Sequence, residues 1–395
     1  MKQPLRLAGE PLPPPPGPAV LAMGFRPFFL LAAAFGAVVL PVWIVVFGGH
    51  LPPGGGLVPT WWHAHEMFIG YTGAVLAGFL LTAARHWSGG RHTAANGALA
   101  VLVLLWLAGR LAHAPGVPGG WWSPLPDAAW LLGTAIAIGR PLVAAGSRRN
   151  YGFLVALPAL AGASVALHAV SDAPSLLRPA LDVPLAVMTA VMVVVAGRIV
   201  PMFTRNALGV EPAPIAPVER ALPWVLGAVV LAALAPAPPA AVGAIEGLAG
   251  ALVLSRMAGW RSPATLRAPL LWILHLGHAF VGVGLLLLAA SRFGHAPPSA
   301  GLHAITAGGI GCLTLGMMAR VSLGHTGRPL QVGRSITVAF VLMAVAASAR
   351  VVSALLGNPP GLLHSAGTAW ALALILWLVV YTPIVLRPRV DGKPG

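Results

Sequence analysis

Apolar runs follow one another almost without a break from Phe28 to Leu386, and no other feature constrains the fold as strongly. A helix needs about 20 mostly apolar residues to cross roughly 30 Å of hydrocarbon. Backbone groups in hydrocarbon must be satisfied within their own segment, so the runs predict helices. Only 8% of the 395 residues are charged, against about 25% in soluble domains. We therefore expect an all-α integral membrane protein, a polytopic bundle of about twelve transmembrane helices.

The expected helices are bounded by Pro, Gly and Arg residues. They cover residues 28–48, 66–84, 93–112, 124–145, 150–170, 178–200, 217–235, 239–258, 269–290, 299–320, 334–356 and 361–386. The seventh and eighth are joined only by a proline-rich turn at 236–239. The predicted organisation is a cytoplasmic segment 1–27, a transmembrane domain 28–386 and a cytoplasmic tail 387–395.

The positive charges predict an orientation, because cytoplasmic loops collect Lys and Arg. With the N-terminus inside, 20 of the 24 Lys and Arg residues fall on the inner side. Both termini are therefore expected in the cytoplasm. The four exceptions on the outer side are Arg110, Arg178, Arg292 and Arg350.

The second, sixth and tenth runs each end in an arginine, namely Arg85, Arg198 and Arg320. This spacing suggests three blocks of four helices. An arginine at the inner end of a span is also what the positive-inside rule produces without any repeat. Both interpretations stay open.

The formal net charge of +15 would indicate nucleic-acid binding in a soluble chain. Here the charges interrupt apolar runs instead of forming a face, so the expected partner is the lipid bilayer and no nucleic acid is expected. The single cysteine, Cys312, excludes an intramolecular disulfide, a CxxC zinc site and a CxxCH haem attachment. Any metal must be held by His, Met, Glu or Asp.

Polar side chains are costly at membrane depth, and the chain has thirteen histidines. Those expected at or near the outer face are His50, His63, His65, His113, His168, His295, His303 and His364. Those expected toward the inner face are His86, His92, His275, His278 and His325.

The densest cluster is the segment Trp61–Phe68, at the outer start of the second span. His63 and His65 can share one metal only where the chain is extended or just entering the helix. Imidazole nitrogen and the thioether of Met67 suit copper, and Glu66 could orient a histidine or relay a proton. An aromatic belt with two interfacial histidines explains the same residues.

His303 and His364 each lie four residues into a span at a similar outer depth. Two imidazoles on different helices can bind a haem iron from opposite sides, and a third could hold copper. We therefore name His63, His65, His303 and His364 as candidate metal ligands. A single histidine near a helix end can equally be an interfacial residue.

A second set of candidates lies toward the inner face. His275 and His278 are three residues apart and share a helix face. With His86 and His325 they could form a second centre. Hydrogen bonds to backbone or Ser and Thr within the bundle are the alternative. The guanidinium groups of Arg198, Arg320 and Arg328 could clamp an anion or haem propionates, or could only set the topology.

Three acids, Asp127, Asp182 and Glu246, lie near the outer ends of spans. They could line a polar path or merely cap helices, and Glu246, which lies deepest, is the strongest candidate of the three.

Several strings together resemble the NnrS family of bacterial membrane proteins. The matching segments are 24–29 (GFRPFF), 62–67 (WHAHEM), 78–87, 197–204 and 308–328, which includes GHTGR at 324–328. The resemblance implies a twelve-span, haem- and copper-containing protein of the bacterial inner membrane that relieves nitric oxide stress. It carries over to His63, His65, Glu66, Arg198, His275, His303, His325 and His364, whereas His278 matches no family motif.

The haem implied by the resemblance is b-type, because no cysteine pair can attach it covalently. Which residue binds which metal, whether nitric oxide is reduced, oxidised or only bound, and what donates electrons stay open. Glu66 is the candidate catalytic proton relay, because it is the acid inside the histidine cluster. The competing function is a transporter or metal-handling protein without gas chemistry.

Overall fold

The computed structural model describes residues 17–171, 173–234 and 237–393, without the side chains of 174–179. Every regular element in these ranges is helical, which confirms the all-α class. Eleven helices or unbroken helical series in the described residues are long and apolar enough to cross a membrane. A shorter apolar helix, α4 (Asn96–Ala112), stands where the third span was predicted. The chain is therefore a polytopic membrane protein.

The elements follow the predicted order, with two spans divided into three parts. Their bounds are α1 (Phe25–Phe47), α2 (Pro59–His65), η2 (Glu66–Thr72), α3 (Gly73–Trp87), α4 (Asn96–Ala112), α5 (Leu125–Ala144), α6 (Gly152–Ala169), α7 (Pro174–Leu208), α8 (Ala216–Leu234), α9 (Pro239–Ala258), α10 (Pro269–Arg292), α11 (Pro298–His303), η5 (Ala304–Ile310), α12 (Gly311–His325), α13 (Arg334–Leu355) and α14 (Pro360–Val385). Short 3₁₀ turns lie at Ala19–Leu21, Arg148–Asn150 and Ser262–Thr265. Of the proline-rich turn between α8 and α9, residues 235–236 lie outside the described residues.

Proline opens several of these helices, among them α2, α9, α10, α11 and α14. The first residue of a helix has no intrahelical use for its N–H, and the fixed φ of proline suits that position. The sequence therefore marks the start of these spans locally.

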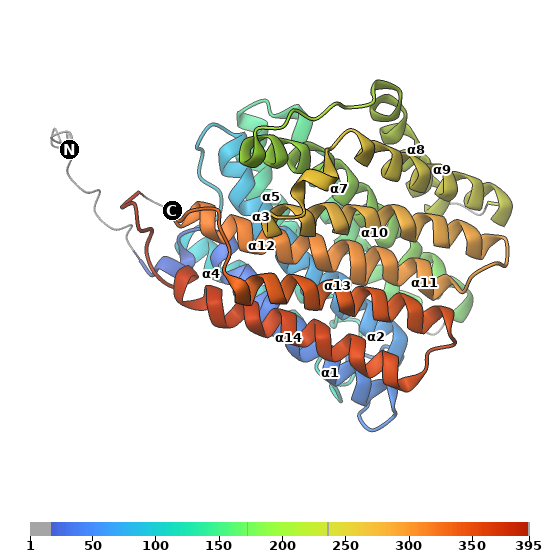
Figure 1. The fold of residues 1–395 in the computed structure, drawn as a ribbon. Helices are drawn as coiled ribbons and strands as arrows, with labels where there is room; N and C mark the ends of the chain where they lie inside the picture. The colour runs from blue at the N-terminus through green and yellow to red at the C-terminus, as the bar shows by residue number, and fades with distance from the viewer. Residues whose placement is uncertain (1–16, 172, 235–236, 394–395) are drawn as a thin grey trace, which may run out of the picture.

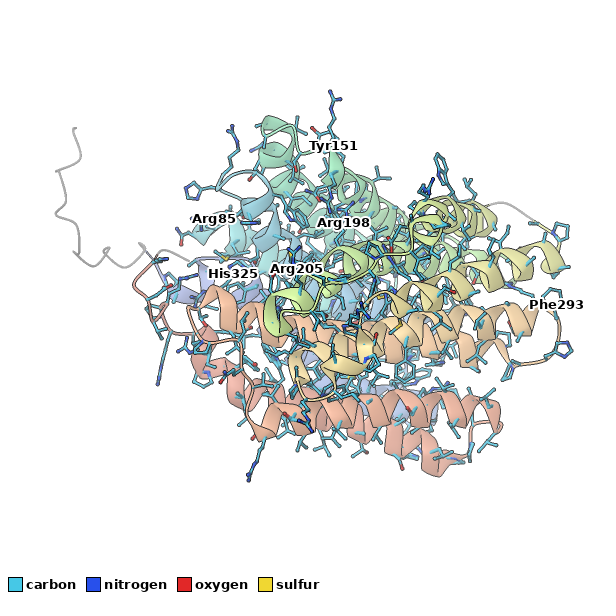
Figure 2. All side chains as sticks on the ribbon, turned by 45° about the horizontal axis from the view of Figure 1, so that its top comes forward. Arg85, Tyr151, Arg198, Arg205, Phe293 and His325 are labelled. Carbon is cyan, nitrogen blue, oxygen red and sulfur yellow. The ribbon has the colours of Figure 1, made fainter. Side chains whose placement is uncertain are left out.

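The first and last long helices pack side by side, as α1 and α14 do in Figure 1. The guanidinium of Arg26 in α1 donates hydrogen bonds to the carbonyls of Val385 and Arg387 at the end of α14. The beginning of α1 and the end of α14 therefore lie at the same end of the bundle, as an even number of spans requires. Figure 2 shows Arg85 and His325 toward this end, with Phe293 at the other.

The second and tenth spans are the most deeply buried of the candidate membrane spans, and each contains a π-helical segment. In one, η2 separates α2 from α3; in the other, η5 separates α11 from α12. Both π segments have seven residues, and both following helices have 15. π segments are rare and frequently occur at functional sites.

The two spans also share a sequence pattern, a histidine followed by glycines five, eight and thirteen residues later. The pattern starts at His65 in one span and at His303 in the other, and each of these histidines directly precedes the π segment. By contrast, α7 is an α-helix over its whole length. The shared pattern of histidine, glycines and π segment therefore links the first and third of the three predicted four-helix blocks. The sixth span, in the second block, does not have this pattern.

The alternation of charge predicts the side of each loop. Reporter fusions on the outer side are expected after His50, Val117 and Ser299. Fusions on the inner side are expected after Arg91, Arg149 and Arg328. Alkaline phosphatase and green fluorescent protein activities measured in intact cells would test this. A break in the alternation before the sixth span would contradict the twelve-span orientation.

Candidate metal centre

Three histidines from three different spans meet in the bundle. His65 ends α2, His113 follows the last residue of α4, and His168 lies in the last turn of α6. One ligand atom from each lies within 4.8 Å of the other two. The ring centroid of His65 is 4.2 Å from that of His113 and 5.4 Å from that of His168. These three residues form the cluster that we call the three-histidine site.

Hydrogen bonds fix which nitrogen of His113 and His168 carries the proton. Nδ1 of His113 lies 2.8 Å from the carbonyl of Gly109, and Nδ1 of His168 lies 2.8 Å from that of Ser164. Because a carbonyl only accepts, both Nδ1 atoms are donors, and in neutral rings both Nε2 atoms then carry lone pairs. The two Nε2 atoms face each other at 2.9 Å. Two lone pairs at this distance repel each other, and a cation bound between them would be attracted to both.

In His65, too, Nδ1 is the donor and Nε2 carries the lone pair. Its Nδ1 lies 2.8 Å from a carboxylate oxygen of Glu66, and its Nε2 lies 3.0 Å from the hydroxyl of Ser164. Since the ionised carboxylate accepts, Nδ1 is the donor and Nε2 is free to accept from the hydroxyl or to bind a metal. A metal-binding histidine almost always donates its other N–H to a carboxylate or a backbone carbonyl. All three histidines meet this condition.

Buried charges surround the three-histidine site. Arg110 in α4 forms ion pairs with Glu66 in η2 and with Asp127 in α5. The second oxygen of Asp127 lies 3.5 Å from His65 Nε2, and within the described residues it accepts no hydrogen bond. Two carboxylates and one guanidinium leave a formal charge of −1 in a buried place. A bound cation would neutralise this charge.

Close packing holds the site from two sides. A Cβ at Gly109 would overlap the carboxylate of Asp127, so glycine is needed for α4 and α5 to approach this closely. Gly55 has a φ of +68° and lies against the ring of His113. The indole of Trp62 donates to the His113 carbonyl at 2.7 Å. The backbone around His113 is therefore fixed before any ligand binds.

A separate cavity of about 400 Å³ lies on the other side of α2, bounded mainly by α1, α2, η2, α11, η5, α13 and α14. His63 and His303 line this cavity, together with Arg350. We call it the histidine cavity. Its wall is otherwise largely aliphatic and aromatic, and its volume lies within the range of roughly 300 to 1,000 Å³ typical of ligand pockets.

The polar groups of the histidine cavity are also oriented. His303 Nδ1 donates to the carbonyl of Ser299 at 2.7 Å, which leaves its Nε2 with a lone pair. The ring of His63 stacks on Trp43, with centroids 4.5 Å apart and 15° between the planes. Arg350 donates to the side chain of Asn358 at 3.0 Å. The chemistry suits a large, mostly apolar ligand that carries acidic groups and a metal.

The structure separates residues that the sequence placed together. His63 and His65 lie two positions apart on α2, yet one enters the histidine cavity and the other the three-histidine site. His364 is exposed near the beginning of α14 and belongs to neither set. His303 joins His63, so the predicted outer ligands are divided between two places.

The inner candidates have different surroundings. The ring nitrogens of His275 lie 3.0 Å from the hydroxyl of Thr204 and 2.8 Å from that of Ser262, which is the hydrogen-bonded alternative. The ring of His278 lies 4.4 Å from that of Trp260, centroid to centroid, at an angle of 33°, and within the described residues neither of its ring nitrogens has a hydrogen-bond partner. The ring of His325 lies 5.8 Å from that of Phe25.

The three inner arginines contact different groups. Arg198 donates to Asn150 at 3.2 Å, and Arg328 donates to a backbone carbonyl at 3.5 Å. The guanidinium carbon of Arg320 lies 3.8 Å from the ring centroid of Phe203. These contacts do not bring the three side chains to one anion site.

The sequence did not single out His113, His168, Arg110 and Arg350 as site residues, and it named Asp127 only as an acid that could line a polar path or cap a helix. For Arg110 and Arg350, the available signal was that both are exceptions to the positive-inside rule. Arg110 belongs to the three-histidine site and Arg350 to the histidine cavity, while Arg292 pairs with Glu246 at 3.0 Å. The side chain of Arg178 lies outside the described residues. Three of the four arginines that the charge rule left as exceptions are thus held by a specific contact. Of Asp127, Asp182 and Glu246, the sequence favoured Glu246, which pairs with Arg292. The one that lies beside the three-histidine site, together with Glu66, is Asp127.

A family model described as "NnrS protein" matches residues 19–389, which include both histidine sites. No curated protein matches the chain.

Proposed function

The chain belongs to the NnrS family, and on this premise we propose that it is a haem- and copper-binding inner-membrane protein that acts in the relief of nitric oxide stress. The observation that carries the proposal is the meeting of three imidazoles with their Nε2 atoms turned toward one another beside a buried negative charge. The membrane is the inner membrane of a bacterium, with both termini in the cytoplasm.

We assign copper to the three-histidine site. Imidazole nitrogens suit copper, zinc and iron, and the hydrogen bonds of the other ring nitrogens make the three Nε2 atoms available together. Copper bound there would supply a redox-active centre inside the membrane. Glu66 and the two backbone carbonyls hold the rings in the tautomer that binds metal, and Arg110 holds Glu66 in place.

We propose that the histidine cavity would hold a b-type haem, with His63 and His303 as the residues that would bind its iron. The mostly apolar wall of the cavity suits the macrocycle, and the fork of Arg350 suits a propionate. His303 is oriented for this role by its bond to Ser299, and His63 by its stacking on Trp43. Neither assignment needs a cysteine.

Glu66 is the residue that we propose as the proton carrier. It is buried at the start of η2, where one of its oxygens contacts both His65 and Arg110. Reduction of two nitric oxide molecules to nitrous oxide and water consumes two protons and two electrons. A carboxylate beside the three-histidine site is positioned to deliver such protons from its neighbours.

Replacement of Glu66 by Gln tests this role. The amide oxygen can still accept from His65, so we expect copper content to be preserved. Any proton-consuming turnover of nitric oxide should fall by a factor on the order of 10² or more, since an amide cannot carry the proton. Nitric oxide consumption at an electrode, with metal analysis of the same samples, measures both. Glu246→Gln, which changes another arginine-paired acid, should leave the rate unchanged. Equal rates in wild type and Glu66→Gln would remove Glu66 from the mechanism.

The overall proposal is tested with purified protein in detergent. Metal analysis should find copper, the absorption spectrum should show a b-type haem, and nitric oxide should shift the absorption of the reduced haem. Cells that lack the protein should grow worse than wild type under nitric oxide. Haem-containing protein whose spectrum does not respond to nitric oxide in either oxidation state would instead favour metal handling or transport.

A further inference from the structure

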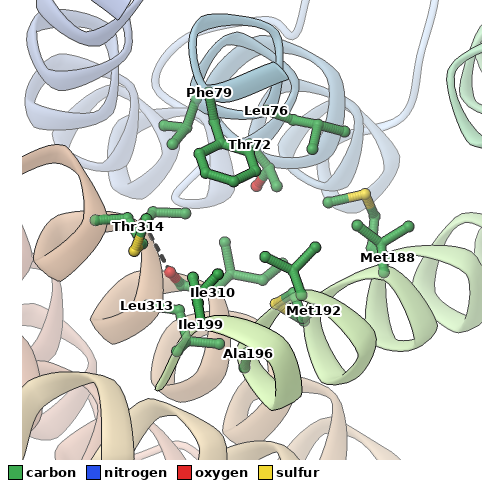
Figure 3. Close-up of a pocket in the computed structure, with 14 residues that line it drawn as sticks. Thr72, Leu76, Phe79, Met188, Met192, Ala196, Ile199, Ile310, Leu313 and Thr314 are labelled. Atoms are coloured by element: carbon green, nitrogen blue, oxygen red, sulfur yellow. Dashed lines mark hydrogen bonds between the residues drawn. The ribbon is translucent and has the colours of Figure 1, made fainter. Parts of the chain in front are cut away.

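A smaller cavity of about 90 Å³ lies between α3, α7 and α12, beside the π segments of the two deeply buried spans. Figure 3 shows the side chains that line it. All of the lining residues except Thr72 and Thr314 are aliphatic, aromatic or methionine. We call it the apolar cavity.

The two threonine hydroxyls do not offer this cavity a free donor. Thr72 donates to the carbonyl of Met67 at 2.7 Å, and Thr314 donates to that of Ile310 at 2.7 Å, the bond drawn in Figure 3. The apolar cavity is partly open at the surface of the bundle, and a wall without polar partners holds water poorly and accepts apolar guests such as xenon. The apolar cavity therefore favours an uncharged, weakly hydrated guest over water or an ion.

The apolar cavity adjoins the histidine cavity. Thr72 and Ile310 line both. These two residues are the last residues of η2 and η5, so both π segments end at the shared wall. The wall consists of side chains from two segments with irregular helical geometry, and a small guest needs to pass only this layer to reach His63 and His303.

We propose that the apolar cavity binds a small uncharged gas molecule and serves as the reservoir from which that molecule enters the histidine cavity past Thr72 and Ile310. A diatomic gas loses little hydration on entering such a site. A charged species such as nitrite would lose its water shell without any replacement partner, so the cavity excludes it. The gas-binding part stands on the cavity alone, whereas the reservoir part rests on the proposed function.

Xenon binding tests the gas site without haem, copper or turnover. Xenon-pressurised crystals of metal-free protein should show an anomalous peak between α3, α7 and α12. Ala196 lines the cavity and is buried, so Ala196→Phe should fill the space and abolish the peak. Ala196→Leu is the milder filling variant should the phenylalanine disturb folding. Ala34→Phe is the matched control, because it adds the same ring at an exposed position of α1.

The outcomes separate the two parts of the proposal. No xenon peak in wild type, or a peak that persists in both filling variants, overturns the gas site. In haem-loaded protein, the filling variants should slow carbon monoxide rebinding after flash photolysis, while Ala34→Phe should not. Unchanged rebinding together with a lost xenon peak overturns the reservoir. Protein that binds xenon but never haem contradicts the proposed function and leaves the gas site standing.

Discussion

Replacement of His168 by Ala is expected to remove most copper from the purified protein. His168 supplies one of three imidazoles, and its loss leaves two neutral ligands beside the charge of Asp127. Loss of a residue that only orients a metal ligand already lowers affinity by roughly 10- to 100-fold, and loss of a ligand should cost at least as much. His65→Ala and His113→Ala should give the same result. Copper per protein, measured by mass spectrometry after dialysis against a weak chelator, tests this.

The controls for this prediction are histidines that the structure places elsewhere. His364→Ala removes an exposed imidazole near the start of α14, and His92→Ala and His295→Ala remove imidazoles from loops. All three should retain wild-type copper. The same copper content in all of the variants would rule out the three-histidine site. Membrane insertion should be unaffected, because alanine preserves the apolar character of the spans.

Replacement of His303 by Ala is expected to abolish haem binding and to spare copper. His303 lines the histidine cavity, whereas none of the three-histidine residues does. His63→Ala should likewise remove a residue that would bind the haem iron, and Arg350→Leu should weaken haem retention because Arg350 would pair with a propionate. The ratio of haem absorbance to protein measures the loss.

The two sets of variants together form a crossed test. Variants of the three-histidine site should lose copper and keep haem, and variants of the histidine cavity should lose haem and keep copper. A single variant that loses both metals while remaining folded would show that the two places are one centre. Such a result would favour the shared site on α2 that spacing first suggested for His63 and His65.

Much of the architecture could be read from local features. The apolar run from 28 to 48, for example, becomes α1 (Phe25–Phe47) within a few residues, because length and apolarity suffice to define a span. The third span was the least typical, since α4 has only 17 residues. Its interior side carries Trp106, whose indole donates to the carbonyl of Gly70 in η2 at 3.0 Å. Hydropathy averaged along a short segment cannot predict such contacts between residues that are distant in the sequence.

The site was less predictable than the fold. Resemblance and spacing drew attention to Glu66, His65, His63 and His303, and the structure gives each of them a defined place near another histidine. The same reasoning passed over His113 and His168, because each stands alone at the end of its helix. Their significance depends on the hydrogen bonds that turn their Nε2 atoms toward each other.

The sequence by itself determined the all-α membrane class and the order of the spans. Each of these follows from the transfer of a short segment between water and hydrocarbon, which depends on that segment alone. Only the tertiary structure decided that His65 meets His113 and His168, while His63 lines the histidine cavity with His303. A helix can rotate about its own axis and bury its polar side chains against different neighbours. The rotation that is adopted depends on how all the neighbouring helices pack, here through glycines such as Gly109 that let two helices approach closely.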